Sequence, residues 1–242
     1  MLIAAILALI VVFSAIAVSY IHFVGNAQIE SSDEHNVASV EKVTIANSTV
    51  GSVEVIKNVG NSSSSEKIAY VVGVHPLEHE VHETLVKILP NRTDLKYCYD
   101  IYVINVTEDV GHYGDGLSDD EDPGRQNGQN LAYEFVYPEI NEGNYDLAID
   151  VHSNVGAYPY KTFVFSPVKG SIAVDYAKVI ADNCFNISYY APDSTTSGPF
   201  LTIPLNENGV PAFYFEEYSF APQDVKDAHV LELIHAVDNL NL

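Results

Sequence analysis

The sequence predicts a layered α/β/α domain with a mostly parallel, mixed sheet, preceded by an N-terminal transmembrane helix. Short apolar runs such as Ile68–Val74 and Tyr145–Val151 alternate along the chain with longer amphipathic segments such as Lys169–Cys184 and Asp224–Leu240. Alternating strands and helices are typical of parallel sheets that are covered on both faces. A long apolar run, Leu2–Val24, stands before all of them.

The apolar run has no charged side chain over 23 positions, enough to cross about 30 Å of hydrocarbon as a helix. We assign residues 1–27 to a membrane anchor or signal segment. Small residues at Gly25-Asn26-Ala27 suit a cleaved signal peptide, but the length of the run and the lack of a preceding Lys or Arg favour an uncleaved anchor. We therefore expect a single-pass protein of the cell membrane with its domain outside the cytoplasm, and secretion is the alternative.

The next segment, residues 28–66, is rich in Ser, Asn, Val and Glu and has no helical stripe. We interpret it as a stalk that could contain a short hairpin at Val43–Val55. The catalytic domain is then expected at residues 67–242, a common size for a single domain with a core of its own. Cys98–Asn105 and Ala212–Phe215 are further predicted strands within it.

Charge and modification signals restrict the partners. The net charge of −22 disfavours nucleic acid and anionic membrane surfaces, because like charges repel. Five N-x-S/T sequons indicate an extracytoplasmic glycoprotein; they begin at Asn47, Asn61, Asn91, Asn105 and Asn186. The two cysteines, Cys98 and Cys184, could form one disulfide or remain two buried thiols.

The segment VVGVHPLEHEVHETL, residues 71–85, combines an apolar strand, a polar turn and an amphipathic helix. Pro76 suits the first helical position, where its missing N–H has no helical partner. His75 and Glu78 follow the carboxyl end of the strand at a spacing of three, so both can bind one metal ion from a rigid support. His79, four residues from His75, is an alternative ligand; otherwise His79 and His82 support the site or lie on the surface.

Two further strand ends carry polar residues. His152, in IDVHSN, follows a predicted strand and is our third ligand, with Asp150 or a nearby carbonyl available to accept the other ring N–H of a ligating histidine. Two histidines and one carboxylate leave an open position for water, as in a catalytic zinc site. Glu216 and Glu217, in PAFYFEEY, end another strand, and one of them is expected to be the general base.

These blocks resemble the zinc metallocarboxypeptidase superfamily, including its succinylglutamate desuccinylase and aspartoacylase branch. The family order is HxxE after a first strand, a middle Arg and Asn-Arg segment, a His at a D-x-H-S-like strand end, and a Glu in a G-I-P-A-F-T-x-E-like strand. This chain has GVHPLE, RQNGQNLAYEF, IDVHSN and GVPAFYFEE in that order. The resemblance implies His75, Glu78 and His152 as zinc ligands and Glu216 as the base, with Glu217 as its neighbour.

In the family's middle block, the first Arg polarises the scissile carbonyl and the Asn-Arg pair binds a substrate carboxylate. The first Arg corresponds to Arg125, whereas the pair falls on Ala132 and Tyr133. We therefore expect no carboxylate clamp. Lys161 is the only plausible basic substitute for the missing arginine, and it is a weak one. We assign substrate binding to Arg125, Asn130, Tyr133 and Glu217. A family tyrosine that covers the substrate could correspond to Tyr189 or Tyr190.

The sequence thus predicts a membrane-anchored, extracytoplasmic, zinc-dependent amide hydrolase, either a carboxypeptidase-like peptidase or an N-acyl deacylase. Its substrate would be a peptide or a small molecule. The alternative is a catalytically inactive ectodomain on the same fold that binds zinc or another ligand. The missing Asn-Arg pair favours the alternative, while Arg125 and Glu216 favour the enzyme, because a pure binding module needs neither.

Overall fold

The computed structural model describes residues 40–108 and 122–242, which fall in one compact unit, Ala38–Leu242. The predicted membrane segment Leu2–Val24 lies outside the described residues. Among the residues described, no helix is long and apolar enough to span a membrane.

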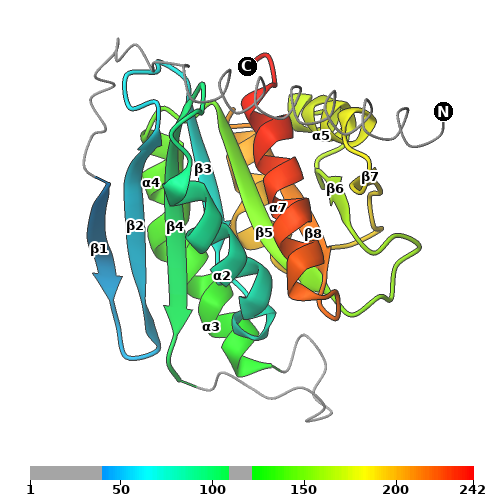
Figure 1. The fold of residues 1–242 in the computed structure, drawn as a ribbon. Helices are drawn as coiled ribbons and strands as arrows, with labels where there is room; N and C mark the ends of the chain where they lie inside the picture. Colours follow the sequence, from blue (N-terminus) through cyan, green and yellow to red (C-terminus); the bar gives the residue numbers. More distant parts are fainter. Residues whose placement is uncertain (1–39, 109–121) are drawn as a thin grey trace, which may run out of the picture. The chain divides into compact units, whose positions relative to one another are not determined.

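One sheet of eight strands, in the order β1-β2-β4-β3-β5-β8-β6-β7, forms the centre of the described unit (Figure 1). The strands are β1 (Glu41–Asn47), β2 (Gly51–Gly60), β3 (Lys67–Val72), β4 (Cys98–Val106), β5 (Leu147–Asn154), β6 (Phe163–Phe165), β7 (Ser188–Tyr189) and β8 (Ala212–Tyr218). The four central strands, β4, β3, β5 and β8, run parallel, whereas β1, β2 and β6 pair antiparallel with their neighbours. The expected mixed, mostly parallel sheet is confirmed.

Helices cover both faces of the sheet, which confirms the expected α/β/α layers. Helices α2 (His79–Ile88), α5 (Ile172–Asn183) and α7 (Gln223–Asp238) pack on one face, and α3 (Pro123–Leu131), α4 (Tyr137–Glu142) and α6 (Thr202–Glu207) on the other. A π-helical turn, Ala132–Val136, joins α3 to α4, and short 3-10 turns lie at Pro76–Glu78, Leu89–Asn91 and Gly198–Phe200.

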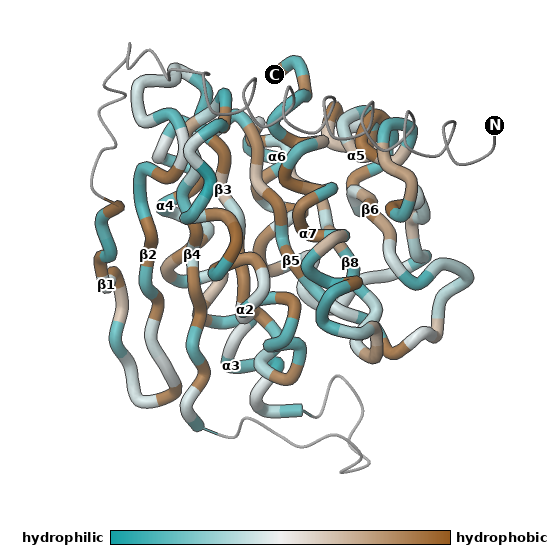
Figure 2. Tube along the Cα trace, viewed as in Figure 1, coloured by the Kyte–Doolittle hydropathy of each residue, from teal (hydrophilic) through white to brown (hydrophobic). Residues whose placement is uncertain are grey.

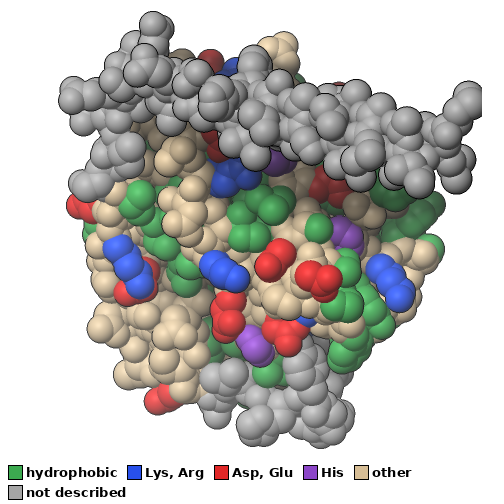
Figure 3. Space-filling view, in the orientation of Figure 1, with side chains coloured by type: hydrophobic (Ala, Val, Ile, Leu, Met, Phe, Trp, Pro, Cys, Tyr) green, Lys and Arg blue, Asp and Glu red, His purple; other side chains and the backbone are tan. Residues whose placement is uncertain are grey.

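Residues of the central strands are apolar on both sides because each side is covered by helices. Ile68, Tyr70 and Val72 of β3 face α2, while Ala69 and Val71 face α3. Hydrophobic segments accordingly recur along β3, β4 and β5 (Figure 2). The outer surface of the face covered by α2 and α7 carries acidic and basic side chains (Figure 3).

The stalk assignment for residues 28–66 is wrong for its second half. Residues 41–60 form β1 and β2, and β2 pairs with β4 inside the sheet. Val53 and Val55 are fully buried, because the alternating pattern of GSVEVIKNVG directs them into the core. The suggested hairpin is confirmed, and the folded domain begins no later than Glu41.

Two other expectations concern single residues. Cys98 and Cys184 are separate thiols, of which Cys98 is buried as expected and Cys184 only partly buried. All five sequon asparagines are exposed, as glycosylation requires; glycosylation itself stays a prediction.

Candidate metal centre

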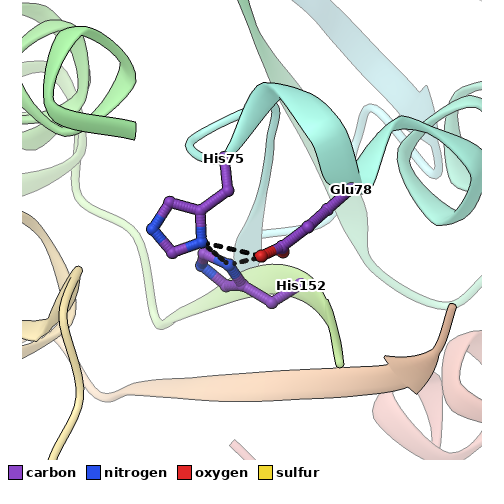
Figure 4. Close-up of side chains that lie close together, drawn as sticks. All are labelled: His75, Glu78 and His152. Atoms are coloured by element: carbon purple, nitrogen blue, oxygen red, sulfur yellow. Dashed lines mark hydrogen bonds and ion pairs between the residues drawn. The ribbon is translucent and has the colours of Figure 1, made fainter. Parts of the chain in front are cut away.

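Three side chains converge at the carboxyl ends of β3 and β5 (Figure 4). His75 Nδ1 lies 2.9 Å from Glu78 Oε1 and 3.0 Å from His152 Nδ1, and His152 Nδ1 lies 2.9 Å from Glu78 Oε2. One ligand atom from each residue lies within 4.8 Å of the other two, and all three residues are buried. The sequence therefore predicted correctly which three side chains meet.

Local structure explains the convergence. His75 precedes the 3-10 turn Pro76–Glu78, whose first position is a proline, and this turn brings Glu78 back over His75. His152 belongs to β5, which pairs in parallel with β3, so the residues at the ends of both strands lie at the same edge of the sheet.

The second ring nitrogen of each histidine also has a partner. Nε2 of His152 lies 3.0 Å from Asp150 Oδ1, as the sequence suggested, and Nε2 of His75 lies 3.2 Å from the Gln129 side-chain amide. A half-turn of that amide presents its oxygen to a His75 Nε2–H. A proton on each Nε2 would leave both Nδ1 lone pairs directed at the shared centre, where a metal ion could accept them.

The electrostatics also fit a cation at this centre. Burial would raise the pKa of Glu78, but the adjacent His75 and His152 rings lower it well below its usual value. Burial lowers the pKa of His75, which favours the neutral, ligating form. Burial also opposes charge on His152, yet Asp150 and Glu78 raise the pKa of His152 well above its usual value, so without metal a proton supplies the positive charge. Two imidazole nitrogens and one carboxylate match the donor set of zinc.

Glu216 faces this centre from β8. It pairs in register with His152 on the neighbouring strand. Burial raises the pKa of Glu216 to about 8; the positive charge of His152 opposes this shift, and Glu78 and Asp150 add to it. Glu216 Oε2 is buried and has no hydrogen-bond partner among the described residues. A buried carboxylate oxygen without a protein partner is suited to contact a water or substrate group at the centre.

Arg125 reaches the centre from the first turn of α3. Asp122 caps this helix by accepting hydrogen bonds from Gly124 N (2.9 Å) and Arg125 N (3.2 Å). The guanidinium donates from Nη1 to Glu78 Oε1 at 3.4 Å and from Nη2 to Thr196 Oγ1 at 3.0 Å. Gly128 allows α3 to pack closely against the backbone of Val74, because a Cβ at position 128 would lie 2.0 Å from the Val74 carbonyl oxygen.

Comparison with solved structures identifies the fold. No family model matches the sequence, and no curated protein matches it either. The tripeptide-bound cell shape determinant protein of Helicobacter pylori aligns with a TM-score of 0.55 and 14% identity, over 77% of this chain and 55% of that one. A metallo-carboxypeptidase from Burkholderia cenocepacia aligns with a TM-score of 0.53 and 12% identity, over 83% of this chain and 64% of that one.

The chain has a metallo-carboxypeptidase fold. The likeness inferred from the four sequence blocks is thus confirmed at the level of the fold. The chain spans between half and two thirds of the length of these two proteins.

The metallo-carboxypeptidase fold does not bring every predicted residue to the metal centre. Glu217 points to the opposite face of the sheet, because neighbouring strand residues alternate. It is fully buried, accepts a hydrogen bond from Thr162 Oγ1 at 3.1 Å, and lies 2.9 Å from His229 Nδ1 through Oε2. The assignment of Glu217 to substrate binding does not fit this position.

Asn130 and Tyr133 also lie away from the centre. Asn130 is exposed and accepts a hydrogen bond from Gln126 Nε2 at 2.9 Å. Tyr133 is 51% exposed and stacks on Tyr137, with ring centroids 5.7 Å apart. Their assignment to substrate binding is therefore not supported, and Gln129 occupies the position expected for Asn130. The helical period could have identified it, since residues four apart, such as Arg125 and Gln129, share a face.

The alternative ligand His79 is excluded by its position. Its side chain is 56% exposed and lies 3.4 Å from Glu83. His82 is buried instead and donates from Nε2 to the Val151 carbonyl at 2.8 Å, next to His152. It therefore supports the end of β5, the strand that carries His152.

Sequence reasoning also missed a cluster of buried hydroxyl groups beside His152. Ser197 Oγ lies 2.8 Å from the Tyr214 hydroxyl and 3.5 Å from His152 Nε2. Thr202 Oγ1 donates to the same Tyr214 hydroxyl at 3.0 Å. Nothing in the spacing of these residues indicates that they meet, because Ser197 lies in a loop, Thr202 begins α6 and Tyr214 belongs to β8.

Proposed function

We propose that this chain is a zinc-dependent hydrolase that cleaves an amide or peptide bond, as a carboxypeptidase-like peptidase or an N-acyl deacylase. The observation that carries the proposal is the convergence of His75, Glu78 and His152 within 4.8 Å, with Glu216 facing them. A purely structural zinc site needs a fourth protein ligand and no adjacent carboxylate. Here the three ligands leave an open position beside Glu216.

Each residue then has a chemical role. His75, Glu78 and His152 would hold zinc, which lowers the pKa of a bound water to about 7. Glu216 would accept the proton of the attacking water and transfer it to the leaving amine. A nearby cation lowers the pKa of Glu216, so this carboxyl would be ionised at neutral pH in the metal-bound protein. Arg125 would donate to the scissile carbonyl and stabilise the developing oxyanion.

We also propose that the substrate end near α3 is not an anion. A bidentate arginine gives carboxylate recognition its strength and geometry. Where the family has its Asn-Arg pair, this chain has Ala132, which is fully buried in the core, and the outward-facing Tyr133. A neutral or amidated substrate end is therefore favoured.

We propose that residues 1–27 anchor the protein in the cell membrane with the hydrolase domain outside the cytoplasm. The apolar run Leu2–Val24 and the five sequons support this proposal. Secretion remains the alternative.

The inactive binding ectodomain is the second candidate, and the absence of the Asn-Arg pair favours it. The deciding experiment is metal analysis of the purified full-length protein, coupled to a screen for hydrolysis of peptides and N-acyl amino acids. We expect about one zinc per chain, lost in His152→Ala and kept in the matched control His79→Ala. Zinc binding without any hydrolysis across the screen would favour the second candidate. Full zinc occupancy in His152→Ala would refute the ligand set.

A further inference from the structure

Three tyrosines, of which the outer two are exposed and the middle one is partly buried, form an aromatic cluster, here called the tyrosine platform: Tyr158, Tyr160 and Tyr190. The Tyr190 ring lies between the other two, with centroids 6.0 Å from each. Tyr158 is 36% exposed and Tyr160 is 46% exposed. Phe163 supports the platform from below, at 5.2 Å from Tyr158 and 5.4 Å from Tyr190. Exposed clusters of large apolar rings commonly mark binding surfaces.

The loop that carries two of these tyrosines is held rigidly by one buried side chain. Asn154, only 6% exposed, donates from Nδ2 to the Lys161 carbonyl at 2.9 Å and accepts from Gly156 N at 3.0 Å. Both ends of the loop 155–162 are thus tied to the end of β5. A surface whose shape is fixed in advance loses less entropy when a ligand binds.

The platform lies at the same edge of the sheet as the metal centre. Asn154 follows His152 by two residues at the end of β5, and β6 begins at Phe163, which pairs with Glu216. In the sheet, β8 lies between β5 and β6, on the side of β5 away from β3. The loop 155–162 therefore passes from β5 to β6 across the carboxyl end of β8. Hydrophobic side chains gather toward the lower right of Figure 3, where Figure 1 draws this part of the chain.

The chemistry of the platform indicates the kind of ligand. An aliphatic side chain gains most in an enclosed pocket, which the exposed rings of Tyr158 and Tyr160 do not provide. The C–H face of a sugar ring can instead stack on the partly negative face of a tyrosine ring, while the hydroxyl at the ring's rim bonds to sugar hydroxyls. Lys161, the basic residue of the loop, directs its ammonium over the ring of Tyr218, which is not part of the platform, at 4.3 Å from the ring centroid. A chain of net charge −22 also disfavours an acidic sugar.

We propose that the tyrosine platform binds a neutral sugar ring, so that the substrate is a peptide or amide attached to a saccharide. This inference rests on the proposed hydrolase function for the identity of the bond that is cleaved. It does not depend on that function for the binding of the sugar.

The test is saturation-transfer NMR on the full-length protein with two neutral probes, tetra-N-acetylchitotetraose and maltotetraose. We expect binding of at least one probe with a Kd of the order of 1 mM, the range of weak association. Tyr160→Ala should weaken binding tenfold or more, whereas Tyr160→Phe, which keeps the ring, should retain most of it. Tyr133→Ala is the matched control, because it removes an exposed, stacked tyrosine elsewhere on the chain.

The outcomes separate the two proposals. Absence of binding for both probes, or equal weakening in Tyr160→Ala and Tyr133→Ala, overturns the platform even if the protein hydrolyses peptides. Binding that depends on Tyr160 supports the platform even if no amide is hydrolysed, in which case the hydrolase function fails alone. As a fluorescence check, Tyr160→Trp places the only tryptophan of the chain in the platform, and its emission should change when the bound probe is added.

Discussion

Replacing His82 by alanine tests whether the buried histidine supports the metal centre. Its side chain is on the buried face of α2 and donates from Nε2 to the Val151 carbonyl at 2.8 Å. Val151 lies one residue beyond the last β3–β5 pair, Val71 with Asp150, and directly precedes His152. His82 therefore supplies a hydrogen-bond donor just beyond the point where pairing with β3 ends.

The structure sets the expected magnitude. A buried carbonyl that loses its partner costs about 1–3 kcal/mol, and truncating a buried side chain of this size costs at least about 2 kcal/mol in lost packing. We expect His82→Ala to lower the free energy of unfolding by about 3 kcal/mol or more. For a domain of this size that corresponds to a decrease in Tm of roughly 6–12 °C. Without this hydrogen bond the end of β5 is less constrained, so zinc binding should also weaken by about 10–100-fold.

The assays are thermal unfolding of the metal-free protein by circular dichroism and a competitive zinc titration. His79→Ala is the matched control, because His79 lies on the same helix with its side chain 56% exposed and should change neither quantity appreciably. A His82→Ala variant with wild-type Tm and zinc affinity, or an equal loss in His79→Ala, would refute the reasoning.

Other residues give further predictions. Glu216→Gln should keep zinc and lower turnover by about 10²–10⁴-fold. Glu217→Gln should instead lower Tm without that selective loss of turnover, because it breaks the buried contacts with Thr162 and His229. The reverse pattern would exchange the two roles. Burial lowers the pKa of His82 to about 4, so the unfolded chain binds a proton that the folded state excludes between about pH 6.5 and 4. Glu216, whose raised pKa acts in the opposite sense, is common to wild type and His82→Gln. As pH falls through that window, denaturant midpoints of the metal-free wild type should therefore fall relative to those of metal-free His82→Gln; parallel midpoints would refute the assignment. Finally, one peptide assayed with a free and an amidated C-terminus should be hydrolysed at similar rates. A preference of a hundredfold or more for the free acid, about 2.7 kcal/mol, would reveal a carboxylate clamp.

The convergence of His75, Glu78 and His152 could be predicted because strand ends restrict where their residues lie. In a parallel sheet, carboxyl ends meet at one edge, so a histidine after β3 and another at the end of β5 must be near each other. The three-residue spacing of His75 and Glu78 then needs only one turn to bring both to the same point. No long-range information beyond the order of strands was required.

The wrong predictions concern residues for which the side-chain repeat of a strand or a helix was not taken into account. Alternation along β8 sends Glu217 to the face opposite Glu216, and the same alternation in GSVEVIKNVG marks a strand that composition alone suggested was a stalk. The helical period likewise selects Gln129 over Asn130 as the partner of Arg125 on one face of α3. Contacts made by loops, such as Ser197 with Tyr214, have no period and could not be predicted.

The two halves of the candidate site are therefore constrained differently by the fold. His152 and Glu216 occupy paired positions on neighbouring parallel strands, so any sequence that preserves the sheet preserves their juxtaposition. Substrate contacts depend on α3 and on loops, whose surface residues can change without disturbing the core. In this chain the positions of the Asn-Arg pair lie at the start of a π-helical turn, where Ala132 fills the core and Tyr133 faces outward. If the proposed function holds, the same fold would thus keep the residues proposed for hydrolysis while the residues proposed for substrate recognition change. For this reason the comparison of free and amidated peptides tests specificity, and the Glu216→Gln variant tests chemistry, independently of each other.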